Sequence, residues 1–165
     1  MASSLFLATS YFIGGLIVFF YCKSIYEVKK TAAFSFFVTI ALYESLTALK
    51  IIFDNEVLNI TAILVFNILI AYFLFKSSVK SSIFHGAVLV ILQLVAEFVT
   101  SSTVALILNV SPKESVKNHF EIGMVLSLMM YFLLSRLLTA FSVKENKSRS
   151  WGKWFGLALL PVSSI

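Results

Sequence analysis

Hydrophobic residues fall into five long runs along the chain, and short polar segments separate them. The runs occupy residues 5–22, 31–53, 57–75, 83–110 and 120–141. At ~1.5 Å of rise per residue, a helix of about 20 residues crosses a hydrocarbon layer of ~30 Å. A sixth run begins at residue 154 and has only twelve residues. The pattern predicts one all-α, polytopic transmembrane helix bundle over residues 1–165, with five complete spans. For the sixth run we favour a truncated span over a half-inserted helix.

The composition is typical of an integral membrane protein and not of a soluble domain. Of the 165 residues, 59% are hydrophobic and 13% are charged, and the mean hydropathy is +0.96. The net charge of +5 does not indicate a nucleic-acid partner, because the basic residues lie mainly in the short segments between apolar runs. Lipids of the membrane are the expected surroundings.

Basic residues also predict the orientation. The first, third and fifth connections hold nine lysines and arginines, whereas the second and fourth hold two, Lys113 and Lys117. Connections rich in Lys and Arg stay in the cytoplasm. We therefore expect the odd connections to be cytoplasmic and the N-terminus to lie outside.

One polar stripe interrupts the fourth run. Gln93, Glu97 and Ser101 are spaced four residues apart, so they share one face of a helix. An ionisable side chain inside a membrane is costly unless it faces protein or water. In the second run, Glu44 is predicted at the same depth as Glu97, about 20 Å from the cytoplasmic end of its helix. We expect both carboxylates to border one cavity that opens outward.

Two further polar residues belong to this predicted cavity, Lys50 toward the outside and Asn67 at its floor. The candidate ligand-binding residues are therefore Glu44, Lys50, Asn67, Gln93, Glu97 and Ser101. An alternative is that these groups only pair across helices, with Lys50 extending toward the outer headgroups. A proton or cation relay would also need such carboxylates, so the stripe alone does not distinguish a receptor from a transporter.

Motifs of enzymes and metal sites are absent from the sequence. It contains no Gly-rich phosphate loop, no HExxH and no GxSxG. His85 and His119 are predicted near opposite membrane faces, and Cys22 is the single cysteine, which excludes an intrachain disulfide. We expect no catalytic residue, no metal and no cofactor in this chain.

The series of closely spaced helices, and the runs FLFKSSVKSSIFHGAVLVILQLVAEFVTSS and SRSWGKWFGLALLPVSSI, resemble the N-terminal membrane sensor module of GHKL-type bacterial sensor histidine kinases. This group includes receptors for cyclic quorum-sensing peptides. The resemblance implies a two-component signal-transduction protein of the bacterial cytoplasmic membrane. It also implies an extracellular peptide or small hydrophobic ligand, a kinase in the longer parent protein, and a homodimer formed by that protein.

Three functions remain open from the sequence. The first is a membrane sensor module that detects an extracellular or membrane-borne signal and passes a helix shift to a kinase. The second is a small transporter subunit or substrate-binding membrane component. The third is a structural helper protein whose helices only pack. A long continuation of the reading frame beyond Ile165 would favour the sensor, and a stop shortly after it would favour the transporter.

Overall fold

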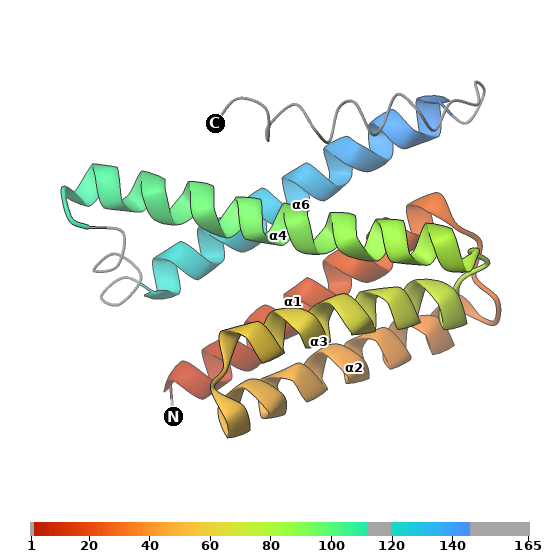
Figure 1. Ribbon diagram of the computed structural model, residues 1–165, viewed down its shortest axis with the longest axis horizontal. Helices are drawn as coiled ribbons and strands as arrows, with labels where there is room; N and C mark the ends of the chain where they lie inside the picture. Colours follow the sequence, from red (N-terminus) through yellow and green to blue (C-terminus); the bar gives the residue numbers. More distant parts are fainter. Residues whose placement is uncertain (1, 112–119, 146–165) are drawn as a thin grey trace.

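The computed structural model describes residues 2–111 and 120–145. Within these residues the chain is helical and its elements follow the predicted runs closely (Figure 1). The elements are α1 (Ala2–Ile25), α2 (Ala32–Phe53), α3 (Glu56–Leu69), the π-helical turn η1 (Ile70–Leu74), α4 (Val79–Leu108) and α6 (Phe120–Glu145).

The predicted all-α bundle is confirmed for these residues. Five helical segments are long and apolar enough to cross a membrane: Ser4–Ile25, Ala32–Phe53, Glu56–Leu74, Val79–Leu108 and Glu121–Ala140. The predicted sixth span, at residues 154–165, lies outside the described residues.

Short polar side chains set the ends of these helices. Thr31, Asn55 and Ser78 each precede a helix and accept a hydrogen bond from a backbone N–H in its first turn, as N-cap residues do. Asp54 and Asn109 end α2 and α4 in the left-handed conformation, with φ of 39° and 54°. The turn between α2 and α3 therefore needs only Asp54 and Asn55.

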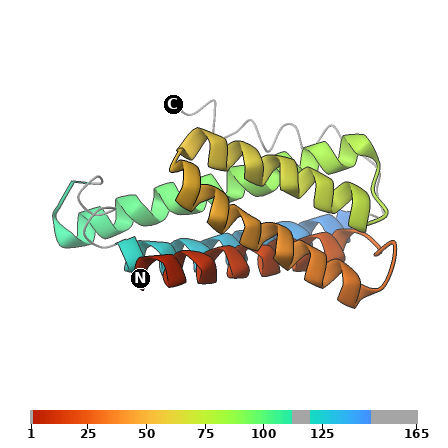
Figure 2. The same cartoon turned by 90° about the horizontal axis from the view of Figure 1, so that it is seen from below.

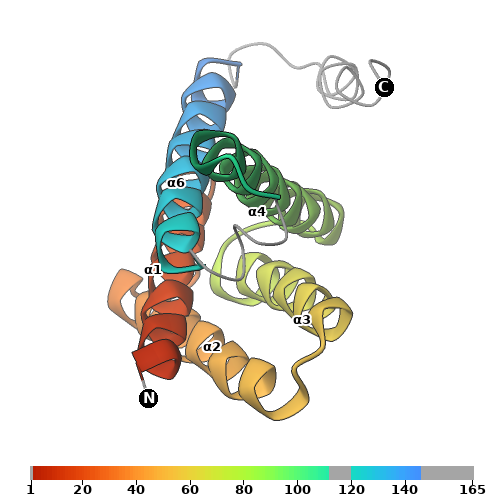
Figure 3. The ribbon, with the colours of Figure 1, turned by 90° about the vertical axis from the view of Figure 1, so that its left-hand side faces the viewer.

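The five long helices run alternately in opposite directions and form a ring. Helix α1 packs against α2 and α6, α4 packs against α6 and α3, and α2 packs against α3. Figure 2 shows α1 and α6 side by side in one layer, and Figure 3 shows the ring from the end that holds the N-terminus. Side chains directed inward from all five helices therefore meet in one interior.

A glycine brings α3 and α4 into close contact near one end of the bundle. A Cβ on Gly86 would lie 2.7 Å from Cγ1 of Ile68 and 3.2 Å from its backbone nitrogen, so no larger residue fits without movement. From this contact the two helices diverge toward the opposite end (Figures 1 and 3). On the other side of the ring, Gly14 and Gly15 lie against the side chain of Tyr43, so these glycines allow α1 and α2 to pack closely.

The same end of the bundle is held together by two connections. Val28 and Phe75 form an isolated antiparallel bridge, and the backbone N–H of Lys76 donates to the carbonyl of Glu27 at 2.8 Å. The Lys76 ammonium also lies 2.9 Å from the Glu27 carboxylate. This ion pair holds the pKa of Glu27 below its ordinary value. The first and third connections therefore lie together, as the predicted topology requires.

Candidate functional site

A cavity of about 490 Å³ lies inside the ring, toward the end opposite these connections. All five long helices contribute to its wall. Its outer part is bordered by Lys50 at the end of α2, Glu56 at the start of α3 and Gly123 at the start of α6. A site of this size, mostly apolar with a few polar groups, is typical of a ligand-binding pocket.

Two tyrosines form the floor of the cavity. Tyr43 and Tyr131 line it, and each is only 2% exposed. The Tyr43 hydroxyl donates to Oδ1 of the fully buried Asn67 at 2.6 Å. The Asn67 amide thus lies behind the floor and fixes the Tyr43 ring, because a hydrogen bond between buried groups is costly to break.

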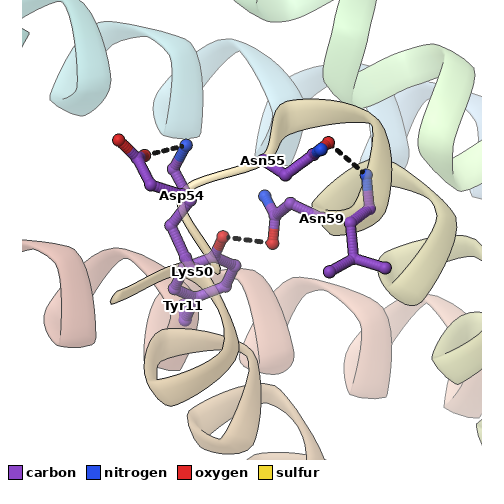
Figure 4. A network of polar contacts seen from close by, with 6 residues as sticks. Tyr11, Lys50, Asp54, Asn55 and Asn59 are labelled. Atoms are coloured by element: carbon purple, nitrogen blue, oxygen red, sulfur yellow. Dashed lines mark hydrogen bonds and ion pairs between the residues drawn. The ribbon is translucent and has the colours of Figure 1, made fainter. Parts of the chain in front are cut away.

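Three polar contacts lie at the rim of the cavity, and one of them joins α1 to α3 (Figure 4). The Tyr11 hydroxyl of α1 donates to Oδ1 of Asn59 in α3 at 2.8 Å. The Lys50 ammonium pairs with the Asp54 carboxylate at 2.9 Å, and Asn55 caps α3 by accepting from Leu58 N at 3.0 Å. The first contact joins α3 to α1, and the other two stabilise the turn between α2 and α3 locally.

The predicted stripe of α4 faces this cavity. Gln93, Glu97 and Ser101 all line it, and the Gln93 amide donates to Oε1 of Glu97 at 3.0 Å. Gln93 and Glu97 also border a smaller cavity of about 50 Å³ between α3 and α4. Since residues of α3 such as Ile63 line both spaces, the interior continues toward the gap between these two helices.

The structure therefore brings most of the predicted residues together. Lys50, Gln93, Glu97 and Ser101 line the cavity, and Asn67 lies directly behind its floor. Glu44 does not line it, although the sequence predicted that Glu44 and Glu97 would share it. Glu44 follows Tyr43, and since successive helical residues are rotated by about 100°, only Tyr43 faces the interior.

Several wall residues were not predicted. Tyr11, Asn59, Gly123 and Tyr131 belong to α1, α3 and α6, and no periodic polar stripe like that of α4 marks them in the sequence. Tyr11 and Asn59 are 48 residues apart, so their contact depends on how α1 and α3 pack. In the sequence, the one indication that Asn59 lines a site is its polar side chain near the end of a predicted span.

A second polar cluster lies near the other end of the bundle. The Tyr21 hydroxyl and Nδ1 of His85 are 2.8 Å apart, and the rings of Tyr26 and Phe84 contact the same imidazole edge to face. Neither Tyr21 nor His85 lines the cavity. This cluster joins α1 to α4 and accounts for a histidine inside an apolar helix.

Comparison with protein-family models, curated proteins and solved structures gave no match. Five helices that are long and apolar enough to cross a membrane, with a cavity that all five line, are the features of a polytopic helical membrane protein.

Proposed function

We propose that the chain is a membrane-embedded receptor module that binds an extracellular or membrane-borne ligand, such as a hydrophobic peptide or a small amphipathic molecule. The observation that carries this proposal is the cavity bordered by all five long helices. A ligand in that position touches every helix, so it can favour one arrangement of the ring over another. Signalling requires this differential binding.

The cavity has the chemistry that such a ligand needs. Aromatic and aliphatic side chains such as Tyr131, Met124 and Leu128 supply apolar contacts, and Glu97 with Gln93 supplies polar anchors. A receptor for an external ligand needs the cavity on the extracellular side of the membrane. Lys23, Lys29 and Lys30 lie at the opposite end of the bundle, and the positive-inside rule favours that end as cytoplasmic.

The contacts at the cytoplasmic end favour a receptor over a transporter subunit. A transporter must open its site to both sides in turn. Here, Gly86 packs tightly on Ile68, and the bridge between Val28 and Phe75 joins two connections. Opening a path at this end would separate those contacts, whereas a receptor needs only a small shift.

For the signal output we propose the sensor histidine kinase suggested by the sequence resemblance. In that scheme, a shift of α6 against α1 and α4 passes along α6 toward the residues after Glu145. The kinase and the homodimer would belong to the longer parent protein.

The test is to fill the cavity. A Cβ on Gly123 meets no atom within 4 Å, so Gly123→Phe should place its ring in the cavity without displacing the helices. We expect an organic extract of the spent culture medium to raise the unfolding temperature of the wild-type protein in nanodiscs. Gly123→Phe should abolish this rise.

The matched control is Ile122→Phe, which adds a ring at a neighbouring position of α6 whose side chain is exposed. It should respond as the wild type does. A full response of Gly123→Phe would show that the ligand binds elsewhere, and accumulation of the ligand inside sealed proteoliposomes would favour the transporter.

A further inference from the structure

We infer that the ligand of this cavity is an amphiphile with a positively charged head, an ammonium group that lies near Glu56 and Glu97 with its apolar chain directed toward the tyrosine floor. This inference rests on the proposed binding role of the cavity and specifies the chemical class of its ligand.

The charges of the wall carry the argument. Three charged side chains line the cavity, Lys50, Glu56 and Glu97. Lys50 is compensated by Asp54, which lies outside the wall at 2.9 Å from its ammonium. Within the described part of the chain, no lysine or arginine forms an ion pair with Glu56 or Glu97. The wall therefore carries an excess of negative charge, which complements a cation.

The position of Glu97 makes this excess costly without a ligand, because Glu97 lies well inside a helix that is apolar and long enough to cross a membrane. Glu97 lies in the apolar helix α4 and has one polar contact, the amide of Gln93. It also lies within electrostatic range of Glu56 on α3. Both side chains are exposed on the cavity wall. A carboxylate within a membrane span needs a compensating partner, and an ammonium beside Glu97 would reduce its repulsion with Glu56 and donate a charge-assisted hydrogen bond to Glu97.

The rest of the cavity selects an organic cation instead of a metal ion. The described residues hold no group of three or more His, Cys, Asp or Glu side chains that would bind a metal. Below the carboxylates the wall is apolar, with Ile63 and Leu128 above the rings of Tyr43 and Tyr131. Such a surface matches an alkyl or side-chain hydrocarbon attached to the charged head.

The gap between α3 and α4 offers a route from the lipid. The smaller cavity lies between these helices and shares Ile60 and Leu94 with the main one. Leu94 is 41% exposed and the adjacent wall residue Phe98 is 73% exposed, so the edge of the gap is apolar. A ligand dissolved in the bilayer can enter with its chain along this edge, and the contact of Gly86 with Ile68 limits how deep it goes.

The experiment compares three photoreactive probes that share one diazirine-bearing alkyl chain and differ in the head, which is an ammonium, a hydroxyl or a carboxylate. The full chain is labelled in phosphatidylcholine nanodiscs, and mass spectrometry locates the crosslinks. We expect the ammonium probe to label cavity residues most and the carboxylate probe least. Glu97→Gln should reduce labelling by the ammonium probe about tenfold, equivalent to about 1.4 kcal/mol, because the amide removes the charge that the ammonium pairs with. It should leave labelling by the hydroxyl probe unchanged.

Glu121→Gln is the matched control. Glu121 is exposed at the start of α6 and does not line the cavity, so its neutralisation should not alter the preference. Equal labelling by the three heads, or unchanged ammonium labelling of Glu97→Gln, would overturn the inference. If the three probes labelled the cavity equally and Gly123→Phe abolished that labelling, the cavity would remain a binding site without charge selectivity. Absence of cavity labelling by every probe would contradict the proposed function itself.

Competition separates two sources of the ammonium group. An apolar tripeptide amide is added with its amino terminus free or acetylated. Competition by the free form alone identifies a peptide amino terminus as a ligand of this site. Competition by neither form, with the ammonium probe still preferred, identifies a lipid-like amine. Both results support a cationic head.

Discussion

Tyr43 connects the cavity to the core of the bundle through one hydrogen bond. Its hydroxyl donates to Oδ1 of Asn67 at 2.6 Å, while Nδ2 of the same amide has no hydrogen-bond partner among the described residues. Since both side chains are buried, the single bond fixes the amide and the ring together. The shape of the cavity floor therefore depends on this pair.

Removing the Tyr43 hydroxyl should lower stability. In Tyr43→Phe the Asn67 amide loses its partner, and we expect a loss of about 1–2 kcal/mol in the free energy of unfolding. Unfolding of the purified protein by detergent titration measures it. Tyr72→Phe is the control, because Tyr72 is 37% exposed and should tolerate the same change. Equal losses in both variants would mean that the hydrogen bond contributes nothing specific.

At the scale of the helices, Gly86 allows close contact between α3 and α4. Gly86 lets α4 pack directly on Ile68 of α3, and the two helices diverge toward the cavity end (Figure 3). Small residues allow such contact in membranes, where lipid supplies no hydrophobic force between helices. Gly123 on α6 is different, because open space lies beside it.

The two glycines should therefore respond in opposite ways to alanine. Gly86→Ala places a methyl group against the side chain and backbone of Ile68, and we expect a destabilisation of about 1–3 kcal/mol from the resulting displacement. Gly123→Ala should leave stability unchanged or raise it by up to about 1 kcal/mol, because alanine favours helix formation. Thermal unfolding of both variants in the same detergent provides the comparison. A stable Gly86→Ala variant would contradict the close packing described for α3 and α4.

For the whole molecule, the distribution of charge follows the two ends of the ring. The end with the bridged connections carries the basic residues Lys29, Lys30 and Lys76, and the cavity end carries Asp54 and Glu56. If the basic end is cytoplasmic, as the positive-inside rule predicts, the cavity faces the outside.

Cysteine labelling in intact cells tests that orientation. Cys22 is buried and should not react with a membrane-impermeant maleimide. We expect Asp54→Cys to be labelled in intact cells, and Lys30→Cys to be labelled only after the membrane is permeabilised. Labelling in the opposite order would place the cavity on the cytoplasmic side and exclude a receptor for external ligands.

The sequence alone determined the number and approximate bounds of the five helices in the described residues, because apolar length and short capping residues such as Thr31 and Asn55 are local properties. It also identified the polar face of α4, since Gln93, Glu97 and Ser101 repeat at helical spacing.

Only the tertiary structure decided which faces meet. Periodicity orients a residue within its own helix and does not identify the neighbouring helix. Glu44 was therefore predicted in the cavity and is not there, whereas Tyr11 and Asn59 join α1 to α3 although no local pattern pairs them. The choice of neighbours follows from close contacts between distant segments, such as Gly86 with Ile68, and these depend on the complementary shapes of two helix surfaces.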